Sequence, residues 1–75
     1  MQIKFSRHAK RRADLYRISE ATIAEILEKK ELSTGRYEII EDVETFKYPI
    51  KIVVAVENDI ITVVSSYPLK KGRKP

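Results

Sequence analysis

The chain has 75 residues, with 15 Lys or Arg against 11 Asp or Glu, for a formal net charge of +4. It has one histidine and no cysteine, which excludes disulfides, thiolate zinc sites and a thiol nucleophile and argues against a zinc or iron centre. We expect one small cytoplasmic domain over residues 1–69, without a cofactor, a signal peptide or a membrane segment, whose small core gains stability from a partner or a homodimer.

The first elements are predicted to be a short strand and a helix. Residues 2–5 alternate polar and apolar side chains, which predicts a strand with one buried face. Ser6 is a favourable N-cap with few helix breakers after it, so a helix is expected from about Arg7 to Arg17. Its buried stripe is predicted to be Ala9, Ala13 and Tyr16. Ile18 falls opposite this stripe, so the helix should end near it.

A second helix is predicted to follow almost at once. Ser19 is again a favourable N-cap, and Glu20 in the first turn suits the positive end of the helix dipole. The predicted buried stripe is Ile23, Ile26 and Leu27. Gly35 ends the helical region. Because the link between the two helices is so short, we expect a helical hairpin.

From Arg36 onward the hydrophobic period changes to two, which predicts strands. The expected strands are Arg36–Glu41, Phe46–Val56 and Ile60–Tyr67, with turns at residues 42–45 and at Asn58-Asp59. Pro49 has no N–H group and marks an edge position or a bulge. The predicted fold class is therefore α+β: one short strand, a helical hairpin and a three-strand antiparallel meander, with the helices packed on one sheet face.

The long middle strand is expected to have one apolar face against the helices and Lys51 on its other face. The apolar face comprises Tyr48, Ile50, Ile52, Val54 and Val56. With a simple two-residue turn, Lys51 lies beside Ser66. One bulge residue instead places it on the same face as Ser65 and Tyr67. The sequence leaves both registers open.

Charge is unevenly distributed along the chain. Residues 1–17 carry six bases and one acid, residues 18–46 three bases and eight acids, and residues 47–75 six bases and two acids. If the two basic ends meet in space, they form a surface suited to a phosphate backbone or to an acidic protein segment. The alternative is a set of charges dispersed over a solvated surface.

His8 and Arg12 are candidates for chemistry because they lie four residues apart on one helix face, beside the predicted buried stripe. Metal-independent cleavage of RNA needs a base for the ribose 2′-hydroxyl, an acid for the leaving oxygen, and cations for the phosphorane charge. Imidazole titrates near neutral pH, so His8 can act as base or acid. Arg12 suits bidentate contact with phosphate. The alternative is a solvated basic helix face with a surface histidine.

The sheet is expected to add Lys51 and Tyr67 to this site. Tyr37, Tyr48 and Tyr67 are also candidate stacking platforms for bases. Each has a structural alternative, since Tyr48 falls on the predicted core face and Lys51 can be an ordinary solvated lysine. Further contacts to RNA are expected from Arg7, Arg11, Lys47, Lys70, Lys71 and Arg73.

Several motifs resemble an uncharacterised family of short bacterial and archaeal domains. Residues 6–12, S-R-H-A-K-R-R, and residues 17–19, R-I-S, resemble the family's S-x-H-A-x-x-R and R-G-I-S. Residues 49–54, P-I-K-I-V-V, resemble its P-L-H-V-V-V strand, and residues 65–67, S-S-Y, resemble its final T-x-Y. The resemblance covers most of the chain, from about residue 5 to residue 68.

That family is similar in element order to the RelE, ParE and BrnT toxins, which are ribosome-dependent or free ribonucleases or gyrase poisons. The resemblance implies a RelE-like fold and a toxin of a type II toxin–antitoxin system that cleaves mRNA, on or off the ribosome. Its catalytic positions fall on His8, Arg12, Lys51 and Tyr67, and its partner is an antitoxin with an acidic segment. Lys51 replaces the family's strand histidine, so a two-histidine mechanism is not available.

The residues also allow two other functions. One is a non-catalytic basic module that binds nucleic acid or a protein partner. The other is a decayed toxin that serves as a structural or regulatory subunit. The basic tail, residues 70–75, is expected to be mobile and bears on each of these functions, because it adds charge beside the strand that ends at Tyr67.

Truncation after Leu69 tests whether the tail belongs to the binding surface. The shortened chain is expected to bind RNA and its protein partner more weakly and with a smaller salt dependence, because four basic side chains are lost beside the site. Its melting temperature should stay nearly unchanged. Affinities measured over a range of salt concentrations check this, and unchanged values for both ligands would identify the tail as a solvated end.

Overall fold

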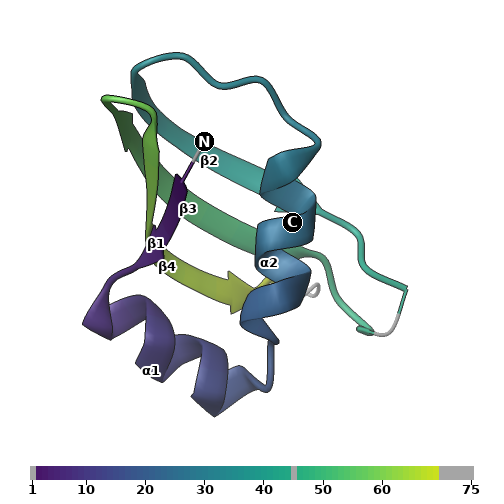
Figure 1. Ribbon diagram of the computed structural model, residues 1–75. Coiled ribbons are helices and arrows are strands. Elements are labelled where there is room, and N and C mark those ends of the chain that lie inside the picture. The colour runs from purple at the N-terminus through teal and green to yellow at the C-terminus, as the bar shows by residue number, and fades with distance from the viewer. Residues whose placement is uncertain (1, 45, 70–75) are drawn as a thin grey trace.

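The structure is a computed structural model that describes residues 2–44 and 46–69. In chain order its elements are β1 (Gln2–Phe5), α1 (Arg7–Tyr16), α2 (Glu20–Glu28), β2 (Gly35–Glu41), β3 (Ile50–Glu57) and β4 (Ile60–Pro68) (Figure 1). The expectation of a small α+β domain with two helices is confirmed. No helix among the described residues is long and apolar enough to cross a membrane.

β2, β3 and β4 pair antiparallel in succession as predicted, but the sheet as a whole differs from the prediction in strand count and order. It has four strands in the order β1-β4-β3-β2, and it is mixed, because β1 pairs parallel to β4 while the other pairs are antiparallel. β1 joins the sheet because Ile3 and Phe5 lie opposite Ile61 and Val63 and pack against the core. A pairing between the first and last strands depends on contacts far apart in the sequence, which a local hydrophobic pattern does not specify.

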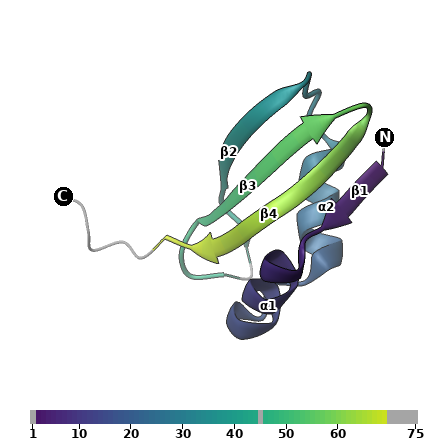
Figure 2. The ribbon, with the colours of Figure 1, turned by 90° about the vertical axis from the view of Figure 1, so that its left-hand side faces the viewer.

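The two helices hold different positions on the sheet. α2 crosses one sheet face and buries Ile23 and Leu27 there, whereas α1 lies beside the far half of β4, beyond the end of β1 (Figures 1 and 2). The core comprises Ala9, Ile18, Ile23, Leu27, Ile39, Ile50, Ile52, Val54, Val56, Ile61 and Val63. Within the described residues, no helix covers the opposite sheet face, which we call the open face (Figure 2).

Ser6 connects α1 to β4. Its Oγ accepts a hydrogen bond from the Ala9 N–H at 3.0 Å, which confirms it as the N-cap. The same Oγ donates to the Val64 carbonyl oxygen at 3.1 Å, and the Ser6 N–H donates to the Val63 carbonyl oxygen at 3.0 Å. Three hydrogen bonds at one residue therefore fix where the helix begins relative to the last strand.

The β3–β4 hairpin combines both features that the sequence left as alternatives. Asn58 and Asp59 have φ of 53° and 62°, as a two-residue type I′ turn requires. The register then shifts between Val53 and Val54, where β4 carries one extra residue, a β-bulge. As a result Lys51 lies opposite Tyr67 on the open face.

The same shift turns Ser66 toward the core, opposite Ile52. Its side chain is fully buried, and its Oγ has no hydrogen-bond partner among the described atoms. A buried hydroxyl without a partner costs about 1–3 kcal/mol. An apolar residue of similar size at position 66 would therefore make this half of β4 more stable than Ser66 does.

The link between the helices corrects the predicted stripe of α1. Arg17 adopts a left-handed conformation with φ of 57°, and the Ile18 N–H donates to the Ala13 carbonyl oxygen at 2.9 Å, which closes a Schellman motif. This turn brings Ile18 into the core with 3% of its surface exposed. Tyr16, predicted in the buried stripe, is 36% exposed, because Ile18 and not Tyr16 fills the space after Ala13.

Two predicted element boundaries are also wrong. β3 begins at Ile50 and not at Phe46, and residues 46–48 form a bend before Pro49, which has no N–H to donate to a strand. Tyr48 therefore lies outside the strand and is half-buried, with the Lys47 ammonium 6.0 Å from its ring centroid. α2 ends at Glu28, well before Gly35, which instead starts β2.

Arg17→Gly is expected to stabilise the fold by about 1 kcal/mol, because a left-handed conformation strains any residue that has a Cβ atom. For a domain of this size the melting temperature should rise by roughly 4–8 °C. The matched control is Arg11→Gly, an exposed position inside α1, which should lose about 1 kcal/mol. Thermal and urea denaturation measure both; a less stable Arg17→Gly chain would show that the left-handed conformation of Arg17 is not strained.

Candidate functional site

Four side chains from four different elements form a row across the open face. Arg12 comes from α1, Tyr67 from β4, Lys51 from β3 and Glu38 from β2. Adjacent members contact one another or lie opposite in register. We call these four residues the cationic row, because its two bases flank an aromatic ring and only its outer end is acidic.

Arg12 and Tyr67 form the first contact of the row. The Arg12 guanidinium carbon lies 5.7 Å from the Tyr67 ring centroid, and both residues are half-buried. This distance is within the range of a cation–π interaction. Arg12 reaches the ring because the next residue, Ala13, is buried and holds that side of α1 close to the sheet. The contact orders the guanidinium, which still has N–H groups to donate to a ligand.

Lys51 is held between Tyr67 and Glu38. Its Nζ lies 2.8 Å from Glu38 Oε1, and the Lys51 side chain is 22% exposed against 64% for Glu38. The hydrogen bond to Glu38 raises the pKa of Lys51 above its ordinary value of 10.5, with smaller contributions from the charge of Glu38 and from Tyr67, while burial acts in the opposite direction. Lys51 is therefore a fixed cation at neutral pH. It suits the stabilisation of negative charge and not the removal of a proton.

His8 lies at the edge of the row without a direct contact to it. It is exposed in the first turn of α1, one turn before Arg12 and on the same side of the helix. The described side-chain hydrogen bonds and ion pairs do not include His8. The structure thus brings together three of the four predicted catalytic residues, Arg12, Lys51 and Tyr67, and leaves His8 about one helical turn away.

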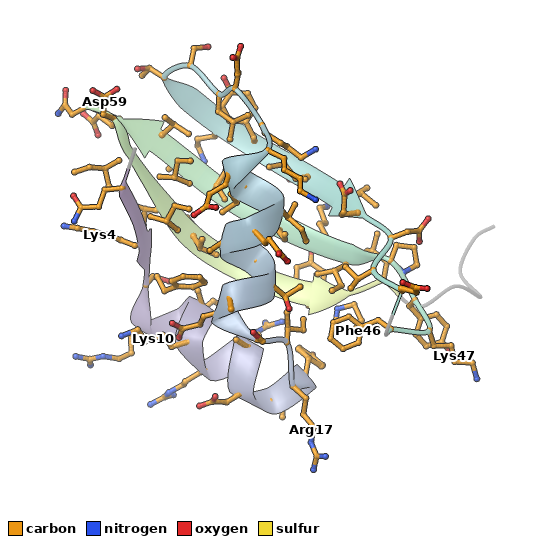
Figure 3. All side chains as sticks on the ribbon, turned by 45° about the vertical axis from the view of Figure 1, so that its right-hand side comes forward. Lys4, Lys10, Arg17, Phe46, Lys47 and Asp59 are labelled. Atoms are coloured by element: carbon orange, nitrogen blue, oxygen red, sulfur yellow. The ribbon has the colours of Figure 1, made fainter. Side chains whose placement is uncertain are left out.

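The remaining predicted RNA contacts are more dispersed. Arg7 and Arg11 are exposed and lie farther around α1 from Tyr67 than Arg12 does. Lys47 projects from the loop before β3, and Figure 3 shows it pointing away from Lys10 and Arg17. Lys70, Lys71 and Arg73 lie outside the described residues. Of the predicted site bases that the structure describes, Arg12 and Lys51 are the two that neighbour Tyr67.

Glu38 is the member of the row that sequence reasoning missed. The alternating pattern of residues 36–41 puts Glu38 and Ile39 on opposite faces of their strand, and the pattern of the middle strand puts Lys51 on the face away from the core. Their meeting depends on the β2–β3 register, in which Glu38 lies opposite Val53 and Ile40 opposite Lys51. Opposite charges on diagonal positions of neighbouring strands were the available signal.

Two hollows of the described surface lie away from the cationic row. One is lined by residues of β1, α2 and the loop after α2: Ile3, Leu27, Glu28, Lys30, Glu31, Leu32, Ser33 and Ile61. Another is mainly acidic and is lined by Thr22, Glu25, Ile26, Lys29, Glu41, Asp42, Val43 and Glu44. Within residues 2–44 and 46–69 no group of three or more His, Cys, Asp or Glu could hold a metal ion. The row lies on a sheet surface, which suits an extended ligand better than a small enclosed one.

Comparison with protein-family models, with curated proteins and with solved structures found no match to this chain. The RelE-like fold, the toxin function and the antitoxin partner are therefore still predictions.

The raised pKa of Lys51 gives a direct test of the row. Because folding raises this pKa, the ion pair with an ionised Glu38 contributes its full stability up to pH 10.5, and that contribution is lost as the pH rises through the folded value of Lys51. Glu38→Gln should lower the pKa of Lys51 toward 10.5, and Tyr67→Phe should lower it less, because Tyr67 contributes less. An NMR titration of the Lys51 ε-methylene group measures both shifts; no difference between wild type and Glu38→Gln would mean that the pair does not form.

Proposed function

We propose that the protein binds RNA across the cationic row and cleaves it as a metal-independent endoribonuclease, the toxin of a toxin–antitoxin pair. The observation that supports this proposal is the placement of Arg12 and Lys51 on either side of Tyr67. Two fixed cations flanking an aromatic ring match the phosphate and base groups of single-stranded RNA. Neighbouring strands lie about 4.8 Å apart, so Lys51 and Tyr67 can engage adjacent groups of one nucleotide chain.

The proposed chemistry assigns a role to each predicted catalytic residue. His8 removes the proton from a ribose 2′-hydroxyl, whose oxygen attacks the adjacent phosphorus. The bond from phosphorus to the 5′-oxygen breaks, and the leaving oxygen takes a proton from solvent water, giving a 2′,3′-cyclic phosphate and a 5′-hydroxyl. Arg12 and Lys51 stabilise the negative charge that develops on the phosphorane. Tyr67 holds Arg12 in place and lies beside Lys51.

The partner in this proposal is an antitoxin with an acidic segment that covers the row. Support comes from the resemblance to the RelE-like toxins and from the charge of the row, since an acidic segment would engage the same cations as the RNA. The resemblance leaves open whether the RNA is cleaved on the ribosome or free. A RelE-like fold is part of the same proposal.

One observation favours a second candidate function, a non-catalytic module that binds RNA. His8 is exposed, and among the described hydrogen bonds no carbonyl or carboxylate orients its ring. Catalytic histidines are commonly positioned by such a partner. In this candidate function Arg12, Tyr67 and Lys51 bind the RNA, and His8 contributes at most a contact.

Binding and cleavage of a single-stranded RNA in the presence of a chelator separate the two functions. The wild type is expected to bind with a log–log salt slope of roughly −2 to −3, from three or four phosphate contacts at about −0.7 each. Arg12→Ala should reduce affinity and make the slope shallower by about 0.7. Lys10→Ala is the matched control, because Lys10 is an exposed base elsewhere on α1 (Figure 3).

His8→Ala decides between enzyme and binding module. In an enzyme this variant should keep its affinity for RNA and lose at least a hundredfold in cleavage rate, as expected when a general acid or base is removed. Products with 2′,3′-cyclic phosphate ends, found for the wild type alone, support the ribonuclease. Binding without cleavage by the wild type would support the module, and absence of binding at low salt would refute both functions.

A further inference from the structure

Glu38 forms an ion pair with Lys51, one of the two cations that the proposed RNA site needs. Its Oε1 lies 2.8 Å from Lys51 Nζ, a distance typical of a charge-assisted hydrogen bond. An ammonium has three donors, but a phosphate oxygen placed beside Lys51 also meets the negative charge of Glu38. The carboxylate is therefore either part of the binding site or a competitor for it.

We propose that Glu38 is an internal competitor of the RNA backbone, which occupies Lys51 in the free protein and swings away when a phosphate takes its place. This inference rests on the proposed function and adds to it the way in which the site selects its ligand. It assigns to Glu38 a role in specificity, acting through Lys51, and no part in the chemical step.

The exposures of the two side chains support displacement of the anion and not of the cation. Lys51 is 22% exposed and lies opposite Tyr67, so its stem is enclosed on the sheet. Glu38 is 64% exposed and belongs to β2, one of the two edge strands of the sheet, so its carboxylate can turn into solvent. Ion pairs with one largely exposed partner are weakly held. The described contacts of Glu38 do not tie it to any residue other than Lys51.

Such a competitor discriminates between ligands by length. A single phosphate that replaces the Glu38 carboxylate exchanges one anion for another and gains little. A nucleotide chain that also reaches Arg12, on the far side of Tyr67, gains further contacts that the carboxylate cannot provide. The row should therefore bind an RNA strand where free phosphate or a mononucleotide fails, because only the strand offsets the displacement of Glu38 with contacts at Arg12.

The test compares Glu38→Gln with Glu57→Gln, each of which removes one negative charge. Glu57 is exposed on β3 six residues from Lys51, or about 20 Å along the strand, so its substitution controls for net charge. Each variant is made in the wild-type chain and in a Lys51→Gln chain. Affinity for a short fluorescent oligouridylate is measured, and pyrophosphate binding is followed by the amide NMR shifts of residues 51 and 67.

Glu38→Gln is expected to bind the oligouridylate about two- to fivefold more tightly than wild type, the range set by an exposed ion pair. Glu57→Gln should change affinity less, and the gain from Glu38→Gln should vanish in the Lys51→Gln chain. Pyrophosphate bound at Lys51 should gain by a similar factor, because displacing Glu38 costs either ligand the same free energy. Equal effects of the two glutamine variants, a gain that persists without Lys51, or weaker binding by Glu38→Gln would each overturn the inference.

The two ligands keep this inference distinct from the proposed function. If the wild type does not bind the oligouridylate, the proposed function fails, and the pyrophosphate titration decides on Glu38. Tighter pyrophosphate binding in Glu38→Gln that requires Lys51 then supports the competition. Identical pyrophosphate binding by wild type and Glu38→Gln overturns it.

Discussion

The hydrogen bonds of Ser6 to the backbone of β4 are the constraint on which the rest of the structure depends. One hydroxyl closes the first turn of α1 by accepting from Ala9 and at the same time donates to Val64. Helix start and strand are thereby fixed to each other, although the two residues lie 58 positions apart in the sequence. The side of α1 that carries Arg12 is consequently aimed at the half of β4 that carries Tyr67.

The β-bulge in β4 determines what α1 meets there. Without the extra residue, the type I′ turn would put Tyr67 on the face covered by α2 and Ser66 beside Lys51. With it, Tyr67 joins Lys51 on the open face, where Arg12 reaches it. Bulges are common where a sheet must redirect a side chain next to a functional site. Ser66, just before Tyr67, faces the core, and its hydroxyl has no hydrogen-bond partner among the described atoms. It destabilises this half of the strand, so core packing alone does not explain why a serine stands there.

The parts of the fold that local chemistry dictates could be predicted from the sequence. Ser6 and Ser19 cap the two helices as expected, because an N-cap depends on the residue itself and the few that follow it. The place of Ile18 could not be predicted, because the left-handed Arg17 breaks the helical period on which the stripe was based. The parallel pairing of β1 and the register at Lys51 were equally inaccessible, since both depend on contacts between distant residues. Arg12, Lys51 and Tyr67 could be chosen by residue type and by resemblance. The contact of Lys51 with Glu38 could not be predicted, because it depends on the register of β2 against β3.

The pairing of the first strand with the last has a consequence for how the protein is made. β1 leaves the ribosome before β4, its strand partner, which follows all the other described helices and strands in the sequence. Domains dominated by such distant pairings fold slowly, because the loop must close before the contacts that stabilise it can form. Arg12 and Tyr67 cannot meet on a nascent chain that still lacks β4. The cationic row is therefore assembled only after β4 has been translated, and a nascent chain that still lacks β4 does not carry this surface.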